Sequence, residues 1–437
     1  MRESPEVHKF GGSCLRDRSD LERIAHIVHE AERPVVLVVS ALWGTTDRLM
    51  RAAKEPRYAG RLVNDLASHH LRFAPSLVDS PLYELFQGVL GGIETSLASL
   101  ASNDGDTLAY NRLLAAGERL SALVIAHDLV QRGIPAHPLG AEDVGLCLEG
   151  VGTARTVDMV RSAQKIDQSA FSDVPVVTGW FGEGSDGHIA LLGRGGSDHT
   201  ATALAALLKA QRVVLWKDVL GIYPINPRWG IASSPIPYLG YAEAVEFANA
   251  DATIIHPATV EPVYTLGIPI EIRHLAGHGQ GNLKTVIGPD IEGPSFIKGV
   301  ACIPRVACLD VRPNSMRGTA NALGDVLTEL QETDVRICSF ETTPNRWRFI
   351  IPQHDVKRSV DVLKRHEAET TYAYYAAMLS FIGCKDSADL KVLLGDDSSI
   401  EQGLLHVTKA SAHLLTQRVD ISAMLDELMT TIKTSQA

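Results

Sequence analysis

Two glycine-rich loops, each directly after a short apolar run, are the segments of this sequence best suited to bind a phosphate. In the first, Lys9 precedes Gly11, Gly12 and Ser13. Adjacent glycines let the backbone come close to an anion and offer it successive N–H donors. Lys9 could then neutralise charge on a transferring phosphoryl group, although a plain turn beside a surface lysine explains the same residues. The motif alone leaves both interpretations open.

The second loop has the sequence GRGGSD at residues 193–198 and precedes an Ala- and Leu-rich helix predicted at 200–208. Free N–H groups at the start of such a helix form an anion site, and Arg194 carries a planar fork that matches a carboxylate. Ser197 or Asp198 could instead simply cap the helix. The chain contains neither GxxxxGK[ST] nor GxGxxG, which excludes Walker and Rossmann nucleotide sites.

A third segment, residues 215–228, could contact a nucleotide. Tyr223 offers a ring that could stack on a base and Arg228 a cation for phosphates, although a β-turn with ordinary tyrosine packing fits equally well. Glu118, which follows Gly117 at the expected start of a helix, could bind a substrate ammonium or only interact with the helix dipole.

These loops connect strand-like apolar runs that alternate with helical stretches. The alternation predicts an α/β sandwich with a mainly parallel central sheet. The strands are expected at 6–10, 34–40, 174–178, 189–192 and 212–216, and the helices at 22–30, 113–130 and 200–208.

The pattern changes at residues 288–294, where the sequence GPDIEGP predicts a linker. Two successive β-α-β-β-α units follow, which suggest a regulatory tandem rather than a second catalytic domain. We therefore expect domains at 1–290, 295–370 and 371–437, with an intertwined arrangement of the last two left open. The strands in this part are expected at 306–311, 335–340, 347–351, 374–382, 404–407 and 413–418.

The composition argues against several kinds of binding partner and site. A formal net charge of −11 argues against a nucleic-acid or anionic-membrane partner, because both require a basic face. The six cysteines form no CxxC pair and the 16 histidines no HExxH motif, so we expect free thiols and no metal site. The N-terminus lacks an apolar signal segment, and no window approaches the roughly 18 apolar residues of a membrane span. A cytoplasmic location is expected.

Taken together, the motifs resemble the aspartokinase branch of the amino-acid kinase family. KFGGS, GERLS, LLGRGGSDHTATALA, DVLGIY, NPR and HPATVEP occur in the family's order over most of residues 7–288. The resemblance implies a three-layer amino-acid kinase fold followed by two α+β ferredoxin-like ACT domains. It also implies ATP-dependent phosphorylation of the β-carboxylate of L-aspartate to 4-phospho-L-aspartate, the first step of aspartate-family amino-acid biosynthesis.

The same resemblance assigns roles to individual residues. Lys9 would stabilise the transferring phosphoryl group and Asp198 would organise Lys9, as the two catalytic residues. The residues expected to hold aspartate are Thr46, Glu118, Arg194 and Ser197. Gly11, Gly12 and Ser13 are expected to contact the phosphates of ATP. The other residues expected to surround ATP are Trp216, Lys217, Asp218, Tyr223 and Arg228. Mg²⁺ should accompany ATP without a dedicated protein cage, because it binds largely through substrate phosphates.

Four positions depart from the family pattern. Asp47 stands where Asn is usual, and Asn226 replaces Asp before Pro-Arg. Lys217 stands where Thr is common, and Thr253 where many members have an ATP-contacting lysine. We hypothesise that Lys217 supplies the cation missing at 253. The alternative is that Lys217 is a solvent-exposed lysine.

The C-terminal units resemble tandem ACT domains, which generally dimerise and bind a free amino acid. Residues 314–318 fit the effector loop of the first unit, whereas residues 382–386 lack the fuller glycine-rich loop. A homodimer with an amino-acid effector is therefore expected. The competing hypotheses are a kinase for another small acid such as glutamate or acetylglutamate, a catalytically silent amino-acid-sensing subunit, and a purely structural dimerisation protein.

Overall fold

The computed structural model describes residues 3–150, 152, 155–250, 254–277, 283–294, 296–313, 319–343, 345–394 and 404–435. The chain divides into two compact units. The first unit comprises Met1–Ile222, Pro235–Tyr241 and Ile255–Asp290, and the second comprises Tyr223–Ser234, Ala242–Ile254 and Ile291–Ala437. Two segments that the sequence placed within 1–290 thus belong to the second unit, and the division into three domains stays a prediction.

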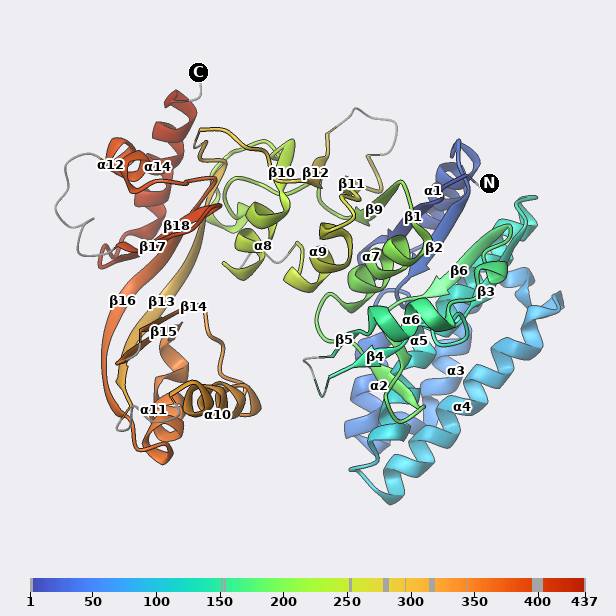
Figure 1. The fold of residues 1–437 in the computed structure, drawn as a ribbon. Helices are drawn as coiled ribbons and strands as arrows, with labels where there is room; N and C mark the ends of the chain where they lie inside the picture. The colour runs from blue at the N-terminus through green and yellow to red at the C-terminus, as the bar shows by residue number, and fades with distance from the viewer. Residues whose placement is uncertain are drawn as a thin grey trace. The chain divides into compact units, whose positions relative to one another are not determined.

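The first unit is built on an eight-stranded sheet with the order β10-β12-β11-β9-β1-β2-β6-β3 (Figure 1). Neighbouring strands are parallel except β11 and β12, which confirms the predicted α/β class with a mainly parallel sheet. The strands are β1 (Glu6–Phe10), β2 (Val35–Val39), β3 (Ala136–Leu139), β6 (Val174–Thr178), β9 (Arg212–Lys217), β10 (Tyr238–Gly240), β11 (Ile270–His274) and β12 (Thr285–Gly288).

One predicted strand lies outside the central sheet. Ile189–Leu192 was expected in the central sheet, but β8 (Ile189–Leu191) pairs antiparallel with β7 (Phe181–Glu183) as a separate two-stranded ribbon. The short apolar run of β8 resembles that of a central-sheet strand. Only the strand with which β8 pairs shows that it belongs to the separate ribbon. A second small ribbon joins β4 (Leu148–Glu149) and β5 (Thr156–Val157).

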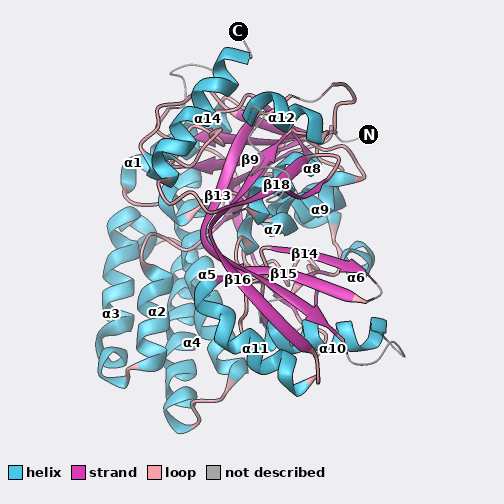
Figure 2. Ribbon diagram, turned by 90° about the vertical axis from the view of Figure 1, so that its left-hand side faces the viewer, coloured by secondary structure: helices cyan, strands magenta, loops and turns pink. Residues whose placement is uncertain are grey.

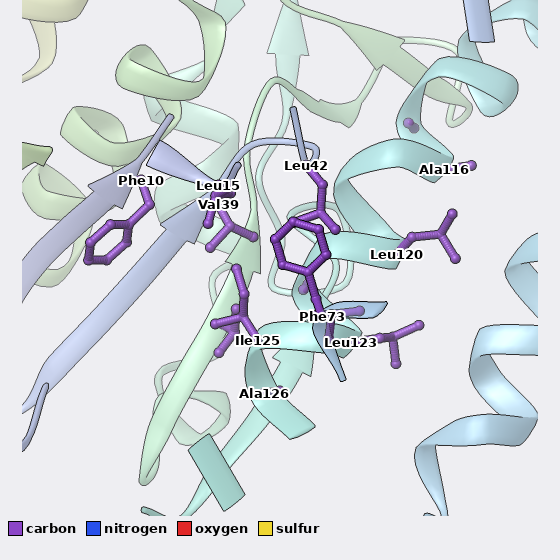
Figure 3. Packing of buried hydrophobic residues seen from close by; sticks show 14 of the residues in the cluster. Phe10, Leu15, Val39, Leu42, Phe73, Ala116, Leu120, Leu123, Ile125 and Ala126 are labelled. Atoms are coloured by element: carbon purple, nitrogen blue, oxygen red, sulfur yellow. The ribbon is translucent and has the colours of Figure 1, made fainter. Parts of the chain in front are cut away.

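Helices cover both faces of the central sheet because its strands are apolar on both faces. In β2 all five residues are buried. Val35, Leu37 and Val39 join the core beneath α1 and α5, whereas α7 packs against β1, β2 and β9 on the other face. Figure 3 shows part of this core, with Leu120 and Ile125 of α5 and Val39 of β2 among its buried side chains. The three-layer prediction is therefore confirmed.

The helices of the first unit follow ordinary rules of helix formation. α1 starts with a reciprocal capping box between Asp17 and Asp20, and α3 with a proline in its first turn. The helices are α1 (Arg18–His29), α2 (Thr45–Lys54), α3 (Pro56–Phe73), α4 (Leu82–Ser102), α5 (Thr107–Gln131), α6 (Met159–Lys165), α7 (Gly196–Leu208) and α9 (Pro257–Tyr264). α8 (Tyr241–Asn249) begins at Tyr241, the last residue of a first-unit segment, and its other residues belong to the second unit.

The second unit contains one six-stranded antiparallel sheet in the order β14-β15-β13-β16-β18-β17. Its two 14-residue strands, β13 and β16, run side by side along most of their length (Figure 2). The strands are β13 (Gly299–Arg312), β14 (Ser339–Thr343), β15 (Arg346–Pro352), β16 (Glu369–Ile382), β17 (Leu404–Val407) and β18 (Ser411–Thr416), and the helices are α10 (Thr319–Glu332), α11 (Val356–Arg365), α12 (Ser387–Leu394) and α14 (Ile421–Ser435).

Two separate cores lie along this sheet. Val300 and Cys302, near the start of β13, pack with α12 and α14, whereas Leu309 and Val311, near its end, pack with α10 and α11. β13 thus contributes to both cores, so the strands of the two expected C-terminal domains form one continuous sheet. Among the described residues, no helix is both long and apolar enough to cross a membrane.

Candidate active site

Parallel strands bring the predicted loops to one edge of the central sheet. β1 lies between β2 and β9, with Phe10 in register with both Val39 and Trp216. The loops that follow these three strands therefore leave the sheet at the same edge, at the carboxyl ends of the strands. In open α/β sheets this is the edge at which ligands bind.

A buried carboxylate at this edge is shared by two lysines. Asp198, in the first turn of α7, lies with one oxygen 2.7 Å from Lys9 Nζ and the other 2.7 Å from Lys217 Nζ. Lys9 is 7% exposed and Asp198 4%. Lys217 is the last residue of β9, and its side chain is 19% exposed. The hypothesis that Lys217 is solvent-exposed is therefore wrong.

Burial and charge set the ionisation of this cluster. Burial alone would raise the pKa of Asp198, but the ammonium groups of Lys217 and Lys9 hold it well below its usual range. Burial lowers the pKa of Lys9, and the Asp198 carboxylate opposes that shift. With all three groups ionised, the cluster carries one net positive charge in a site largely shielded from water. Such a site attracts an anion strongly.

The loop after β1 lies close to this cluster. A Cβ atom added at Gly11 would lie 3.2 Å from Lys9 Nζ, and one added at Gly12 would lie 3.1 Å from the Ala41 carbonyl oxygen. Gly11 is extended rather than left-handed. A larger residue would fit tightly at either position, and Ser13 follows the glycines within the 3₁₀ turn Gly12–Cys14.

Glu118 is a second buried carboxylate, on α5. It is 2% exposed, one oxygen accepts from the Ala41 backbone N–H at 3.3 Å, and the other has no hydrogen-bond partner among the described residues. Burial raises its pKa to about 8. The helix approaches the 40–45 loop closely, because a Cβ atom at Gly117 would lie 3.0 Å from the Ala41 side chain. Because the Glu118 carboxylate is shielded from water, a bound cation would stabilise its ionised form.

Hydroxyl groups converge from two loops on the same region. α2 begins after Gly44, which is left-handed at φ 74°. Thr45 is fully buried, its hydroxyl lacks a partner among the described residues, and Thr46 is half-buried beside it. The Ser40 hydroxyl donates to the Ser197 hydroxyl at 3.1 Å and so links the 40–46 loop to the GRGGSD loop.

Arg194 lies exposed within the GRGGSD loop. The loop turns at Gly195, where φ is 72° and a Cβ atom would lie 2.6 Å from the His256 side chain, so glycine is required there. Burial and the positive charge of Arg194 both lower the pKa of His256. An exposed guanidinium at this place remains free to contact a carboxylate.

The residues predicted at the nucleotide differ in burial and belong to both units. The Trp216 ring is buried, stacks against Phe10 at 6.0 Å between centroids and donates to His8 at 3.3 Å. Its ring is therefore part of the core, contrary to the expectation that it would contact ATP. Asp218 is half-exposed and lies 3.2 Å from Arg16. Tyr223, half-buried, and Arg228, exposed, belong to the second unit, and Thr253 lies outside the described residues.

Trp180 was not predicted to lie at the GRGGSD loop, and neither Ser40 nor Thr45 was predicted as a binding residue. Trp180 has φ 73°, which is unusual for a bulky residue, and its Cδ1 would lie 2.6 Å from a Cβ atom at Gly196. Its backbone N–H donates to the Thr200 hydroxyl at 3.2 Å. The letters WF after Gly179 give no sign of this conformation, because it arises from packing against the GRGGSD loop.

Known proteins with similar sequences are aspartokinases. The chain is 29% identical over 306 residues to an aspartokinase of Geobacillus stearothermophilus, covering 68% of this chain and 62% of that protein. It is 27% identical over 342 residues to the lysine-sensitive aspartokinase 3 of Escherichia coli, covering 76% of this chain and 74% of that protein. A match to a bifunctional aspartokinase/homoserine dehydrogenase of Daucus carota covers 91% of this chain but 45% of that protein.

Solved structures share the fold. An Escherichia coli aspartokinase III in complex with aspartate and ADP superposes with a TM-score of 0.78 at 21% identity, over 98% of this chain and 99% of that one. An aspartate kinase of Clostridium acetobutylicum gives a TM-score of 0.71 at 17% identity, over 98% of this chain and all of the other.

The sequence model of the amino acid kinase family matches residues 5–274. This match covers well over half of the 437 residues and includes the β1 loop, Glu118 and the lysine-flanked Asp198. This chain therefore belongs to the amino acid kinase family.

Proposed function

We propose that this protein is an aspartate kinase, which transfers the γ-phosphoryl group of ATP to the β-carboxylate of L-aspartate. The observation that carries the proposal is Asp198 held between Lys9 and Lys217 at the sheet edge that also presents Glu118. The relatives named as aspartokinases favour aspartate over glutamate or acetylglutamate as the acceptor.

The acceptor half of the site complements the charges of aspartate. Glu118 is buried with one unpartnered oxygen, which suits an ammonium group with three donors. The exposed guanidinium of Arg194 would bind a carboxylate through two parallel hydrogen bonds. Thr46 and Ser197 would position the acceptor with their hydroxyl groups, since the 40–46 loop and the GRGGSD loop are joined at Ser40.

The donor half supplies cations and backbone N–H groups. Gly11, Gly12 and Ser13 would contact ATP phosphates, while Lys9 and Lys217 neutralise charge that develops on the transferring group. A β-carboxylate oxygen of aspartate forms the new bond to the γ-phosphorus as the bond to the β–γ bridging oxygen breaks, and ADP leaves. Little covalent chemistry is required from the protein, so positioning and charge stabilisation carry the catalysis.

Mg²⁺ is proposed to arrive with ATP, because it retains waters and binds chiefly through substrate phosphates. It would supply further neutralisation of the phosphate oxygens. The half-exposed Asp218 carboxylate, at the end of β9, would bind a water of the hydrated ion. Tyr223 and Arg228 are proposed to contact the nucleotide as well.

The second unit is proposed to contain the ACT pair, to bind a free amino acid and to form a homodimer. One antiparallel sheet with helices supports this, as does an Escherichia coli aspartokinase III in complex with lysine and aspartate. The expected effector loop at 314–318 lies outside the described residues. A cytoplasmic location is also proposed, in keeping with the bacterial aspartokinases that the chain resembles.

The direct test is an ATP/Mg²⁺ assay in which hydroxylamine traps the acyl phosphate. Aspartate, glutamate and acetylglutamate are compared, with Lys9→Ala as the control. We expect hydroxamate from aspartate alone, and its loss in the variant. Absence of turnover with all three acids, together with binding of a free amino acid, would instead support a silent regulatory subunit.

Lys217→Met is expected to lower kcat by about 10²–10³-fold, since it removes one of two cations at the transferring group. Steady-state kinetics with ATP and aspartate varied separately provide the measurement. The matched control is Lys357→Met on α11, where the lysine is exposed in the second unit. An unchanged kcat and an unchanged KM for ATP would show that Lys217 has only a structural role.

A further inference from the structure

A cavity of about 590 Å³ lies between α2 and α3, apart from the loops described above. Its walls include Arg48 and Arg51 of α2 and Arg72, His69, Tyr58 and Asp65 of α3. The volume lies within the range of small-molecule sites. The lining is unusual because most of its polar groups are cationic or donate hydrogen bonds.

The charges in this cavity are unbalanced. Three guanidinium groups face one carboxylate, that of Asp65. Arg51 stacks on the Tyr58 ring and lies 3.8 Å from Glu55, but the Arg48 side chain forms no ion pair within the described part of the chain. Arginine is always charged, so the excess positive charge cannot be relieved by losing a proton. All three arginines are exposed, so water screens part of this charge, and a bound anion would balance the rest.

His69 adds a buried donor to the same wall. Its side chain is 7% exposed, and Nδ1 accepts from Arg72 Nη2 at 3.0 Å. Since a guanidinium can only donate, the proton of the neutral ring lies on Nε2. That atom has no partner among the described residues. Burial and the charges of Arg48 and Arg72 lower the pKa of His69, and an interaction with the Trp43 backbone opposes that shift.

We propose that this cavity is a second anion-binding site, which takes a small molecule with two or more closely spaced oxyanions, either phosphates or carboxylates. The arginines bind the oxyanions through paired hydrogen bonds, and His69 holds Arg72 in place by accepting from its Nη2. The cavity is lined from α2 and α3 alone, and its lining includes none of the residues proposed to bind aspartate or ATP. It does not depend on the proposed function.

The test measures binding directly, so a failed kinase assay does not affect it. Inorganic pyrophosphate and citrate are titrated separately into the full-length Lys9→Ala variant by calorimetry at constant ionic strength. The Lys9→Ala background weakens phosphate binding at the transfer centre. We expect saturable binding of at least one anion, and the preferred one identifies phosphate or carboxylate as the ligand chemistry.

Variants assign the binding to the cavity. Arg48→Gln with Arg72→Gln is expected to weaken the affinity by at least 10-fold. Arg61→Gln, at an exposed α3 arginine that is not part of the cavity lining, should leave it unchanged. If the double variant does not fold, Arg51→Gln provides the same comparison. The absence of saturable binding, or equal affinities in the cavity variants and their parent, would overturn the proposal.

Discussion

Asp198→Asn is expected to reduce kinase activity by at least about 10²-fold and to lower the free energy of unfolding by about 3–5 kcal/mol. Asparagine preserves the shape of the side chain but removes the charge that both lysines contact at 2.7 Å. Two largely buried ammonium groups then face each other without a counter-ion. Urea unfolding and the hydroxamate assay measure the two effects separately.

A double-mutant cycle identifies the cause. With Asp198 present, Lys217→Met leaves a balanced pair of Lys9 and Asp198. In the Asp198→Asn background the same change removes one of two uncompensated charges, so it should stabilise the protein. The energies are not additive, because the residues are in contact. If Lys217→Met has the same effect on unfolding in both backgrounds, the shared-carboxylate explanation fails.

Glu118→Gln is expected to raise the KM for aspartate by about 10- to 100-fold, because a charge-assisted hydrogen bond to the substrate ammonium is lost. The effect on kcat should be smaller, since the ammonium does not take part in the bond changes. Kinetics with aspartate varied at saturating ATP measure this. Glu94→Gln, at an exposed position on α4, is the matched control. An unchanged KM would exclude Glu118 as the ammonium ligand.

The same substitution should stabilise the unliganded protein in a pH-dependent way. Burial raises the pKa of Glu118 from 4.5 to about 8, so the folded state keeps a proton that the unfolded state loses. Wild-type stability therefore falls as the pH rises from 4.5 to 8, by at most about 1.4 kcal/mol per pH unit. Glutamine has no proton to lose.

The advantage of Glu118→Gln in melting temperature should accordingly be absent below pH 4.5, grow up to pH 8 and remain constant above it. Thermal unfolding across this range tests the expectation, with Glu94→Gln as the control. A difference that does not change with pH would show that Glu118 ionises normally in the folded protein. Saturating aspartate should reduce the difference at neutral pH, since it compensates the wild-type carboxylate.

Much of the candidate site follows from local sequence. Apolar runs such as residues 35–39 form strands that are buried on both faces, and such strands become parallel neighbours beneath helices. Parallel neighbours place their following loops at one edge. Lys9 with its glycines and the segment after β9 could therefore be assigned to one edge from the chain alone, whereas the GRGGSD loop follows β8, which lies outside the central sheet.

Other features depend on contacts between residues far apart in the chain. Trp216 was expected at the nucleotide, yet its ring packs into the core against Phe10. Residues 189–191 looked like a sheet strand but pair only with 181–183 among the described residues. β13 was predicted from 306, yet it begins at Gly299 because its first half pairs with β16. In each case the local pattern fits two environments, and the partner decides between them.

The charge states of the site residues could not be predicted from the sequence for the same reason. Lys217 looked equally like a surface lysine, and only the approach of β9 to the first turn of α7 places it on Asp198. Glu118 looked equally like a helix-dipole partner, and only the packing of α5 on the 40–45 loop buries it. Residue types and spacing thus determined which groups could act, whereas tertiary structure decided their charge states, because desolvation and neighbouring charges depend on contacts that local sequence does not specify.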